Sequence, residues 1–416
     1  MKKYLYLFLV VMFLGCGGGG EKKLPTSMPM ASDTGEIAEA KLVLDYINNY
    51  RTKAGMIELS EIDELDTAAF NHANYLYINN ETGHYEDKDK DGFTGEWPSD
   101  RIVYAGYLTR FSVENVSSGQ RNYILSIEGL FSAIYHRFGF LKEDIDTIGI
   151  GIKDKKYVYD MSNSNLNDLC SYDSYEGGSY YQNICADEEL KIEAGDYNEA
   201  LDDIKSKNSD IIIWPYDGAD EVMPVFYEET PDPLPDYSVS GYPISIQFND
   251  YYFENNVTLN SFKLYDENGN EITDVRLLDK DSDPNSRFTD KQFALFPLKR
   301  LEWDSEYSVS VEYTYEDKDY TLNWSFKTKK LPYDYFRIDT DDITIDVDSN
   351  KTYAYYFVPK DGNDTITGYS YSYPSGDSVE SGFIDANTIW AKVTGKSGDE
   401  IKFEFSNGNK LTLIIK

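Results

Sequence analysis

The sequence predicts an α+β domain followed by all-β modules, and three observations support this fold class. Apolar residues recur at helical spacing from Glu36 to about Arg137, and two strand-like segments follow them. The proline-rich run 231–235 marks a domain boundary. Beyond it the hydrophobic period becomes two, which is typical of strands. A chain of 416 residues is long enough for several domains of this kind.

The composition limits the partners of the chain. Lys and Arg total 39 against 74 Asp and Glu, and the formal net charge is -35. Such a surface repels phosphate backbones, so we exclude a nucleic-acid partner. The hydrophobic residues, 41% of the chain, suffice for several cores. The acidity therefore describes the surface and does not indicate global disorder.

The first 35 residues predict export and anchoring. Lys2 and Lys3 precede an apolar stretch that is too short to span a bilayer, so residues 1–15 are expected to be a signal peptide. The run that ends in Gly15 and Cys16 resembles the lipobox of bacterial lipoproteins, which implies acylation of Cys16. An ordinary signal peptide with an incidental cysteine is the alternative. Residues 16–35 are then a lipidated tether.

This resemblance to lipoproteins also suggests where the chain resides. We expect a cell-envelope protein whose contact with the membrane is the lipid anchor, because nothing later in the sequence looks transmembrane. By lipoprotein sorting rules, Gly17 after Cys16 implies the outer membrane, at its periplasmic face or its surface, rather than the inner membrane.

Export also bears on the two remaining cysteines. Cys170 and Cys185 are expected to form a disulfide in an oxidising compartment. A zinc or redox role is the alternative, and it is less favoured because neither cysteine lies in a CxxC pair or near a histidine. We therefore place the disulfide in an extension of the first domain.

The predicted elements follow one another in a simple order. Helices are expected near 36–50, 65–76 and 123–137, and strands at 147–152 and 157–161. These make up a first domain at 36–165, and residues 166–236 are its disulfide-containing extension. Short strands separated by turns predict a β-sandwich at 237–330 and a smaller β module at 331–416.

All three histidines lie between residues 72 and 136, so a metal or proton-transfer site is expected in the first domain. His72 shares an apolar helix face, which favours a packed core histidine over a ligand. His84 stands in the glycine-containing loop Gly83-His84-Tyr85, where a side chain can face a cleft. His136 lies near the end of the third predicted helix.

Several short motifs together resemble a bacterial CAP domain, the superfamily of cysteine-rich secretory proteins, antigen 5 and plant pathogenesis-related proteins. The resemblance covers about residues 36–165. The motifs are Asn71-His72-Ala73, Gly83-His84, Pro98-Ser99-Asp100-Arg101, Ala105-Gly106-Tyr107, Glu114-Asn115-Val116, His136-Arg137 and Ile148-Gly149-Ile150-Gly151. The resemblance implies an α-β-α sandwich whose cleft is lined by two His and two Glu residues, with zinc or another divalent ion in some members.

Carried over by motif, His84, Glu114 and His136 fill three of those four places. The second Glu is missing, because Ser132 and Ala133 stand where the family has it and Glu128 lies a further turn upstream. Two imidazoles and one carboxylate could hold zinc with an open fourth position, or could line a metal-free, hydrogen-bonded cleft. Both alternatives stay open at this point.

A calcium site is a second, less favoured hypothesis. Asp87, Asp89, Asp91 and Gly92 occupy the first, third, fifth and sixth positions of an EF-hand-like loop. The twelfth position is Pro98 instead of the bidentate Glu. A solvated acidic loop is the favoured interpretation.

Residues 237–330 resemble a bacterial immunoglobulin-like domain, through Gly241-Tyr242-Pro243 at the start and Trp324-Ser325-Phe326 at the end. The favoured hypothesis is a non-enzymatic envelope lipoprotein whose cleft binds a small-molecule, lipid, glycan or protein ligand, with the β modules as spacer or adhesion surface. The rivals are a metal-assisted hydrolase of peptides or envelope polymers, and a structural adhesin.

Overall fold

The computed structural model describes residues 7–10 and 35–416, without the side chains of 7–10 and 35–38. Cys16 and most of the predicted leader and tether lie outside the described residues. The segment Leu7–Val10 (β1) pairs antiparallel with Gly368–Ser372 (β19). None of the described helices is long and apolar enough to cross a membrane.

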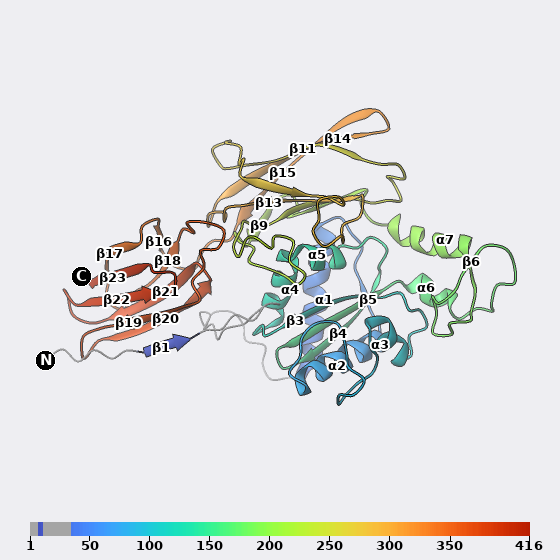
Figure 1. The fold of residues 1–416 in the computed structure, drawn as a ribbon, viewed down its shortest axis with the longest axis horizontal. Helices are drawn as coiled ribbons and strands as arrows, with labels where there is room; N and C mark the ends of the chain where they lie inside the picture. Colours follow the sequence, from blue (N-terminus) through green and yellow to red (C-terminus); the bar gives the residue numbers. More distant parts are fainter. Residues whose placement is uncertain (1–6, 11–34) are drawn as a thin grey trace.

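The first domain is built around one sheet, in the order β2-β4-β5-β3, with helices packed against it (Figure 1). The first elements along the chain are α1 (Gly35–Lys53), β2 (Ser60–Glu61), α2 (Asp63–Ile78), α3 (Pro98–Tyr104) and β3 (Val113–Ser118). They are followed by α4 (Tyr123–Ser132), α5 (Ile134–Phe140), β4 (Thr147–Lys153) and β5 (Lys156–Ser162).

Two glycines set the close approach of α2 to β4. A Cβ atom on Gly149 would lie 1.9 Å from the carbonyl carbon of Leu65, and one on Gly151 would lie 2.1 Å from that of Ala69. Only glycine leaves room for the helix backbone at these two positions. The glycines of the motif Ile148-Gly149-Ile150-Gly151 thus fix the helix on the sheet.

The predicted helix 123–137 is two helices in the structure. Ala133 has an extended backbone, with φ -80° and ψ 116°, and it ends α4 and caps α5. The break has a physical cause, because Oε1 of Glu229 accepts a hydrogen bond from the Tyr135 amide at 3.2 Å. A carboxylate thereby satisfies a free N–H at the start of the new helix.

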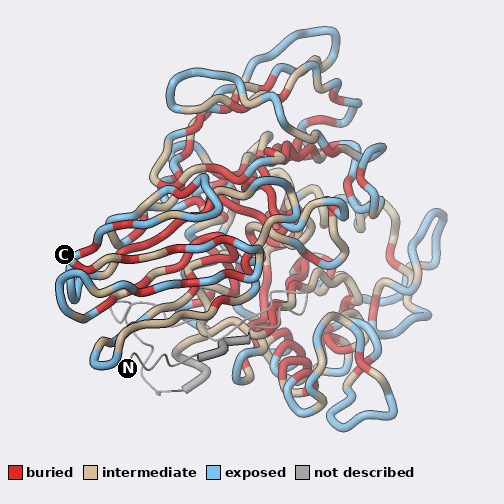
Figure 2. Tube along the Cα trace, turned by 60° about the vertical axis from the view of Figure 1, so that its left-hand side comes forward, coloured by how far each residue is buried: buried red, intermediate tan, exposed pale blue. Residues whose placement is uncertain are grey.

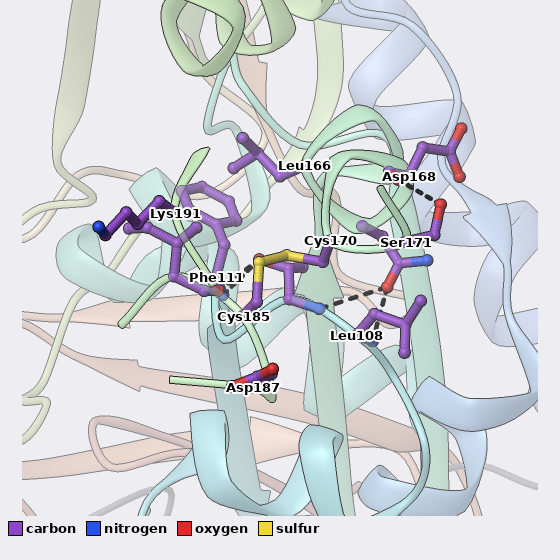
Figure 3. Close-up of a disulfide and its surroundings, with 12 residues drawn as sticks. Leu108, Phe111, Leu166, Asp168, Cys170, Ser171, Cys185, Asp187 and Lys191 are labelled. Atoms are coloured by element: carbon purple, nitrogen blue, oxygen red, sulfur yellow. Dashed lines mark hydrogen bonds between the residues drawn. A yellow bond between two sulfur atoms is a disulfide. The ribbon is translucent and has the colours of Figure 1, made fainter. Parts of the chain in front are cut away.

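The extension continues with α6 (Ser164–Leu169), β6 (Tyr180–Tyr181), β7 (Ile192–Glu193) and α7 (Ala194–Lys205). Cys170 and Cys185 form the predicted disulfide, with their Cα atoms 5.5 Å apart (Figure 3). Backbone hydrogen bonds from Arg110 to Ile184 and from Ala186 to Leu108 tie the loop to the first domain. The disulfide loop is therefore docked on the segment that precedes β3.

The β-sandwich has two four-stranded sheets, β12-β13-β10-β8 and β11-β14-β15-β9. Its strands are β8 (Ile211–Trp214), β9 (Ala219–Val222), β10 (Ile244–Phe248), β11 (Thr258–Tyr265), β12 (Val275–Leu278), β13 (Gln292–Pro297), β14 (Glu306–Tyr315) and β15 (Lys318–Thr328). Since β8 and β9 are strands of these sheets, the sandwich begins before the boundary expected at residue 237.

The core also crosses that boundary. One cluster of buried side chains joins Phe131 and Phe140 of the first domain to Trp214, Tyr242 and Ile244 of the sandwich. In Figure 2 the buried segments lie in the interior of the molecule, and the exposed ones lie mainly along the outer loops. The proline-rich exit, whose Leu234 is itself buried, therefore connects parts that share one hydrophobic core and is not a linker between independent domains.

The C-terminal module has a separate core and two further sheets, β16-β18-β21-β20 and β1-β19-β22-β23-β17. Its strands are β16 (Tyr335–Ile338), β17 (Asp342–Val347), β18 (Thr352–Phe357), β19 (Gly368–Ser372), β20 (Ser378–Asp385), β21 (Thr388–Thr394), β22 (Glu400–Phe405) and β23 (Lys410–Ile415). The predicted fold class, an α+β domain followed by all-β modules, is confirmed.

Candidate functional site

Glu114 is the centre of the candidate site. It lies on β3, opposite Asp160 of β5, and its side chain is buried. Its Oε1 lies 2.7 Å from Nδ1 of His84, and its Oε2 accepts a hydrogen bond from Nη2 of Arg101 at 2.6 Å. Although burial raises the pKa of Glu114, Arg101 and the histidines His72 and His84 hold it well below its ordinary value. Glu114 is an ionised, fully engaged acceptor.

His84 is presented by a short loop that Arg101 holds in place. Nη1 of Arg101 donates to the backbone carbonyl of His84 at 3.0 Å, and the Glu86 amide donates to the Glu96 carbonyl at 3.1 Å. The side chain of His84 is 40% exposed. Because a carboxylate only accepts, Nδ1 of His84 carries the proton toward Glu114, and Nε2 remains available to a ligand.

His72 lies behind the site and not in it. It is fully buried, with Nδ1 2.8 Å from Oε1 of Glu86 and Nε2 2.9 Å from the carbonyl oxygen of Gly83. Glu86 in turn accepts the Thr94 amide at 2.7 Å. Both ring nitrogens therefore lie within hydrogen-bond distance of oxygen atoms in the core. The His72–Glu86 pair supports the loop that carries His84.

His136 reaches the same place from α5. Its ring centroid lies 6.2 Å from that of His84, with an angle of 24° between the ring planes. Its Nδ1 lies 2.9 Å from Oε2 of Glu229, a buried residue in the segment before the proline-rich run. Each imidazole is therefore backed by its own buried carboxylate, and the Nε2 atom of each is the free one.

The two imidazoles line one small cavity. Its volume is about 70 Å³. The lining residues are Thr82, Gly83, His84, Val116, Ser118, His136 and Thr230. The hydroxyl of Ser118 is buried, and among the described residues it has no hydrogen-bond partner. A buried hydroxyl without a partner is costly, so the cavity favours a polar ligand atom beside it.

Asp160 is a buried carboxyl group next to Glu114. Neither of its oxygens has a hydrogen-bond partner among the described residues. Burial, together with the neighbouring charge of Glu114, raises the pKa of Asp160 well above its ordinary value, and Arg101 opposes this. The raised pKa favours the protonated form of Asp160, which limits the buried negative charge in the cluster around Arg101.

The structure thus brings the three predicted cleft residues His84, Glu114 and His136 together, but it gives Glu114 a supporting position instead of a free carboxylate. Glu128 does not join them, because its carboxylate accepts a hydrogen bond from the Tyr46 hydroxyl at 3.1 Å. Glu229 takes the empty fourth place. Sequence analysis missed it because it lies 93 residues beyond His136 and in no motif.

The acidic loop does not form a cation cage. Asp87 accepts the Asp89 amide at 3.0 Å, and the Lys90 ammonium group pairs with Glu81. No group of three or more His, Cys, Asp or Glu side chains within 39–416 is arranged to hold a metal ion. The loop is exposed at Asp89 and Asp91.

Comparison with known proteins identifies one family region in the chain. Residues 44–162 match the model of the CAP family, described as the cysteine-rich secretory protein family. The chain therefore contains a CAP domain at these residues, as its motifs predicted. A search among curated proteins finds no significant match.

Solved structures add distant similarities. An extracellular protein containing an SCP domain from Bacillus anthracis is 18% identical, with a TM-score of 0.28, and the match covers 30% of this chain and 40% of that one. An outer surface protein from Borrelia burgdorferi is 20% identical, with a TM-score of 0.26, over 32% of this chain and 96% of that one. Tandem immunoglobulin domains of titin are 12% identical, with a TM-score of 0.17, over 42% and 87%.

Proposed function

We propose that this chain is a cell-envelope lipoprotein whose CAP domain binds a ligand between His84 and His136. The observation that carries the proposal is the pairing of each imidazole with a buried carboxylate in one cavity. Such pairing fixes ring orientation and tautomer before a ligand arrives, which reduces the entropy cost of binding.

The geometry favours binding over hydrolysis. Cys170 and Cys185 are joined in a disulfide, and the Ser118 hydroxyl forms no hydrogen bond with either imidazole. A serine or cysteine nucleophile needs a base within hydrogen-bond reach. A metal-assisted hydrolase, with His84 and His136 as ligands, is the rival that the experiment below separates.

Zinc is the second candidate ligand, because histidines that bind zinc commonly donate their other ring N–H to a carboxylate. His84 and His136 would hold the ion through Nε2, and it would supply Lewis acidity to a bound ligand. Two protein ligands are fewer than the three that catalytic zinc sites use, and both oxygens of Glu114 are already engaged. The residues therefore fit a weak zinc site at most.

The membrane anchor is proposed at Cys16, with the outer membrane as the location. The test is the variant Cys16→Ser, which keeps the signal peptide but removes the acylated thiol. We expect it to leave the membrane fraction and to lose labelling by a palmitate analogue. A variant that stays in the membrane fraction with the label retained would contradict the anchor.

The β modules are proposed to hold the cleft in place as well as to extend the chain. The sandwich shares its core with the CAP domain, and Arg137 of α5 donates to the Pro243 carbonyl and the Ser245 hydroxyl at 2.8 and 3.0 Å. A passive CAP scaffold for an adhesin does not need this support of the helix that carries His136.

The experiment uses residues 16–416 with the substitution Cys16→Ser, hereafter the soluble mature chain. This protein is titrated with zinc and, separately, with calcium, and binding is measured by calorimetry. The comparison is the double variant His84→Ala/His136→Ala, with Glu96→Gln as an exposed control. Zinc binding that disappears only in the double variant would justify assays for hydrolysis. Zinc binding that is the same in the double variant as in the unchanged chain would exclude a zinc ion in the cleft. If calcium binds, the variant Asp87→Asn would be tested next.

A further inference from the structure

We propose that the ligand of this cleft is a neutral glycan, with two of its hydroxyl groups at His84 and His136 and a sugar ring stacked on Tyr85 and Trp97. The inference rests on the proposed function and names the class of ligand for the same site. Four observations carry it: the free polar atoms, the size of the cavity, an exposed aromatic pair and the charge.

The polar atoms left for a ligand are suited to hydroxyl groups. All four oxygens of the two carboxylates already have partners, namely His84 and Arg101 on Glu114, and His136 and the Tyr135 amide on Glu229. What faces the cavity is an acceptor nitrogen on each imidazole and the hydroxyls of serine and threonine residues. A sugar hydroxyl can donate to Nε2 and accept from a serine or threonine.

Ser118 gives an independent reason for a polar ligand. Its hydroxyl lines the cavity, is buried, and has no partner within the described part of the chain. Its neighbours in the lining, Thr82 and Thr230, add two further hydroxyls. Apolar ligand atoms would leave the Ser118 hydroxyl unsatisfied, at a cost comparable to a lost hydrogen bond.

The cavity is too small for a whole ligand. A volume of about 70 Å³ corresponds to roughly five water-sized positions. It can admit one edge of a sugar ring, and the rest of an oligosaccharide must lie on the surface outside it. The surface beside the opening therefore matters as much as the cavity.

The loop that presents His84 also carries one member of an exposed aromatic pair. Tyr85, which directly follows His84, is 49% exposed, and Trp97 is 53% exposed. Their ring centroids lie 5.8 Å apart in an edge-to-face arrangement. The backbone hydrogen bond from Glu86 to Glu96 keeps the two segments together. Large aromatic side chains left in solvent next to a cleft commonly mark a binding surface, and their faces suit the apolar C–H face of a sugar.

Charge excludes acidic ligands. The chain has a formal net charge of -35, and the loop after Tyr85 contributes Asp87, Asp89 and Asp91 against Lys88 and Lys90. This field repels sulfated or phosphorylated polymers. A neutral glycan is not subject to that repulsion, and its hydroxyls match the atoms of the cavity.

The test uses imidazole resonances, because the chain has only three histidines. Cellotetraose, maltotetraose and chitotetraose are titrated into the soluble mature chain and followed by ¹H–¹⁵N correlation spectra of the imidazoles. We expect one of these sugars to shift the signals of His84 and His136 and to leave those of His72 unchanged, since both His72 nitrogens have partners in the core.

Matched variants locate the stacking surface. Trp97→Ala should weaken sugar binding about tenfold, because it removes one of the two aromatic faces on which the sugar ring stacks. Tyr104→Ala, which removes an even more exposed aromatic residue at the other end of α3, should leave binding unchanged. An unshifted His72 signal in each variant confirms that the domain has kept its fold.

Other outcomes separate this inference from the proposed function. Zinc and ethylammonium, a small hydrogen-bond donor, serve as the two comparison ligands. If no sugar shifts the signals of His84 or His136 but zinc or ethylammonium does, the glycan inference is overturned and the proposed binding cleft stands. If a sugar binds while His84 and His136 stay unshifted, the glycan site lies elsewhere and the inference is again overturned. If none of the sugars, zinc or ethylammonium shifts these two residues, the inference and the proposed cleft both fail.

Discussion

Nδ1 of His136 lies 2.9 Å from Oε2 of Glu229, although 93 residues separate them in the chain. The same carboxylate accepts the Tyr135 amide through its other oxygen. One side chain from the connection to the β-sandwich therefore starts helix α5 and orients the imidazole that this helix carries. The cleft of the CAP domain is completed from outside the family region at 44–162.

The first prediction concerns Glu229→Ala. The variant leaves both the Tyr135 amide and the His136 Nδ1–H without an acceptor, at a cost of about 1–3 kcal/mol in the free energy of unfolding. We expect His136 to populate both neutral tautomers, because nothing then fixes its proton on Nδ1. Imidazole ¹⁵N shifts measure the tautomer populations. Glu228→Ala is the control, since that residue is exposed. A single, unchanged His136 tautomer in Glu229→Ala would show that the carboxylate does not orient the ring.

The sequence predicts some of these residues and not others, for physical reasons. His84, Glu114 and His136 lie in short motifs, and the order of these motifs along the chain can be recognised without knowledge of the fold. Glu229 stands beside Glu228 in no recognisable motif, and only the folded path of the chain brings it to His136. Asp160 left a usable signal, because it is the one charged residue in the interior of an otherwise buried strand.

The start of the β-sandwich also cannot be predicted from local sequence patterns. The apolar run Ile211–Trp214 is recognisable as a strand, but its partner is β10, more than thirty positions on, in antiparallel register from Trp214 and Ser245 to Ile211 and Phe248. Pairing over that distance is set by the shared core and not by a hairpin turn. The sequence therefore shows the strand but not the sheet to which it belongs.

The second prediction follows from this pairing. A chain that ends at residue 236 deprives β8 of β10 and β9 of β15, and it exposes the core around Phe131 and Trp214. We expect it to lose cooperative thermal unfolding and the native His136 signal. A chain that ends at residue 330 keeps both sheets and should retain the native His84 and His136 signals. Native signals from the 236 chain would contradict the shared core.

The third prediction concerns Asp160→Asn. The folded-state pKa of Asp160 is raised, so the unfolded chain releases this proton first and stability falls as pH rises above the ordinary Asp value of about 4. Asparagine has nothing to release. The variant should therefore gain stability relative to the wild type as the pH rises above about 4, by up to about 1.4 kcal/mol per pH unit, and should lose that advantage near pH 3.

Urea denaturation at pH 3, 5 and 7 measures this difference directly. Asp220→Asn is the matched control, because Asp220 is exposed. A difference between Asp160→Asn and the wild type that stays constant across this range would show that Asp160 is ionised in the folded protein. It would also place an additional negative charge beside Glu114.

The last prediction concerns the contact between the sandwich and the C-terminal module. The buried guanidinium of Arg300 lies 4.8 Å from the ring of Trp303 and 4.3 Å from that of Tyr356, and its Nη2 lies 2.5 Å from Oδ2 of Asp385. Arg300 belongs to the sandwich side, whereas Asp385 ends β20. The ion pair and the two rings therefore join modules that have separate cores.

Asp385→Ala should leave the guanidinium of Arg300 buried and unpaired, at a cost of roughly 3–5 kcal/mol. The double variant Arg300→Met/Asp385→Leu removes both charges and should cost much less, because apolar side chains can replace a buried ion pair. Differential scanning calorimetry should show one coupled transition in the wild type and two separate transitions in Asp385→Ala. Lys299→Met, at a well-exposed neighbouring position, should behave as the wild type. If Asp385→Ala also unfolds in one transition at the wild-type temperature, the pair does not couple the modules, and the apolar contacts around Trp303 and Leu331 must do so instead.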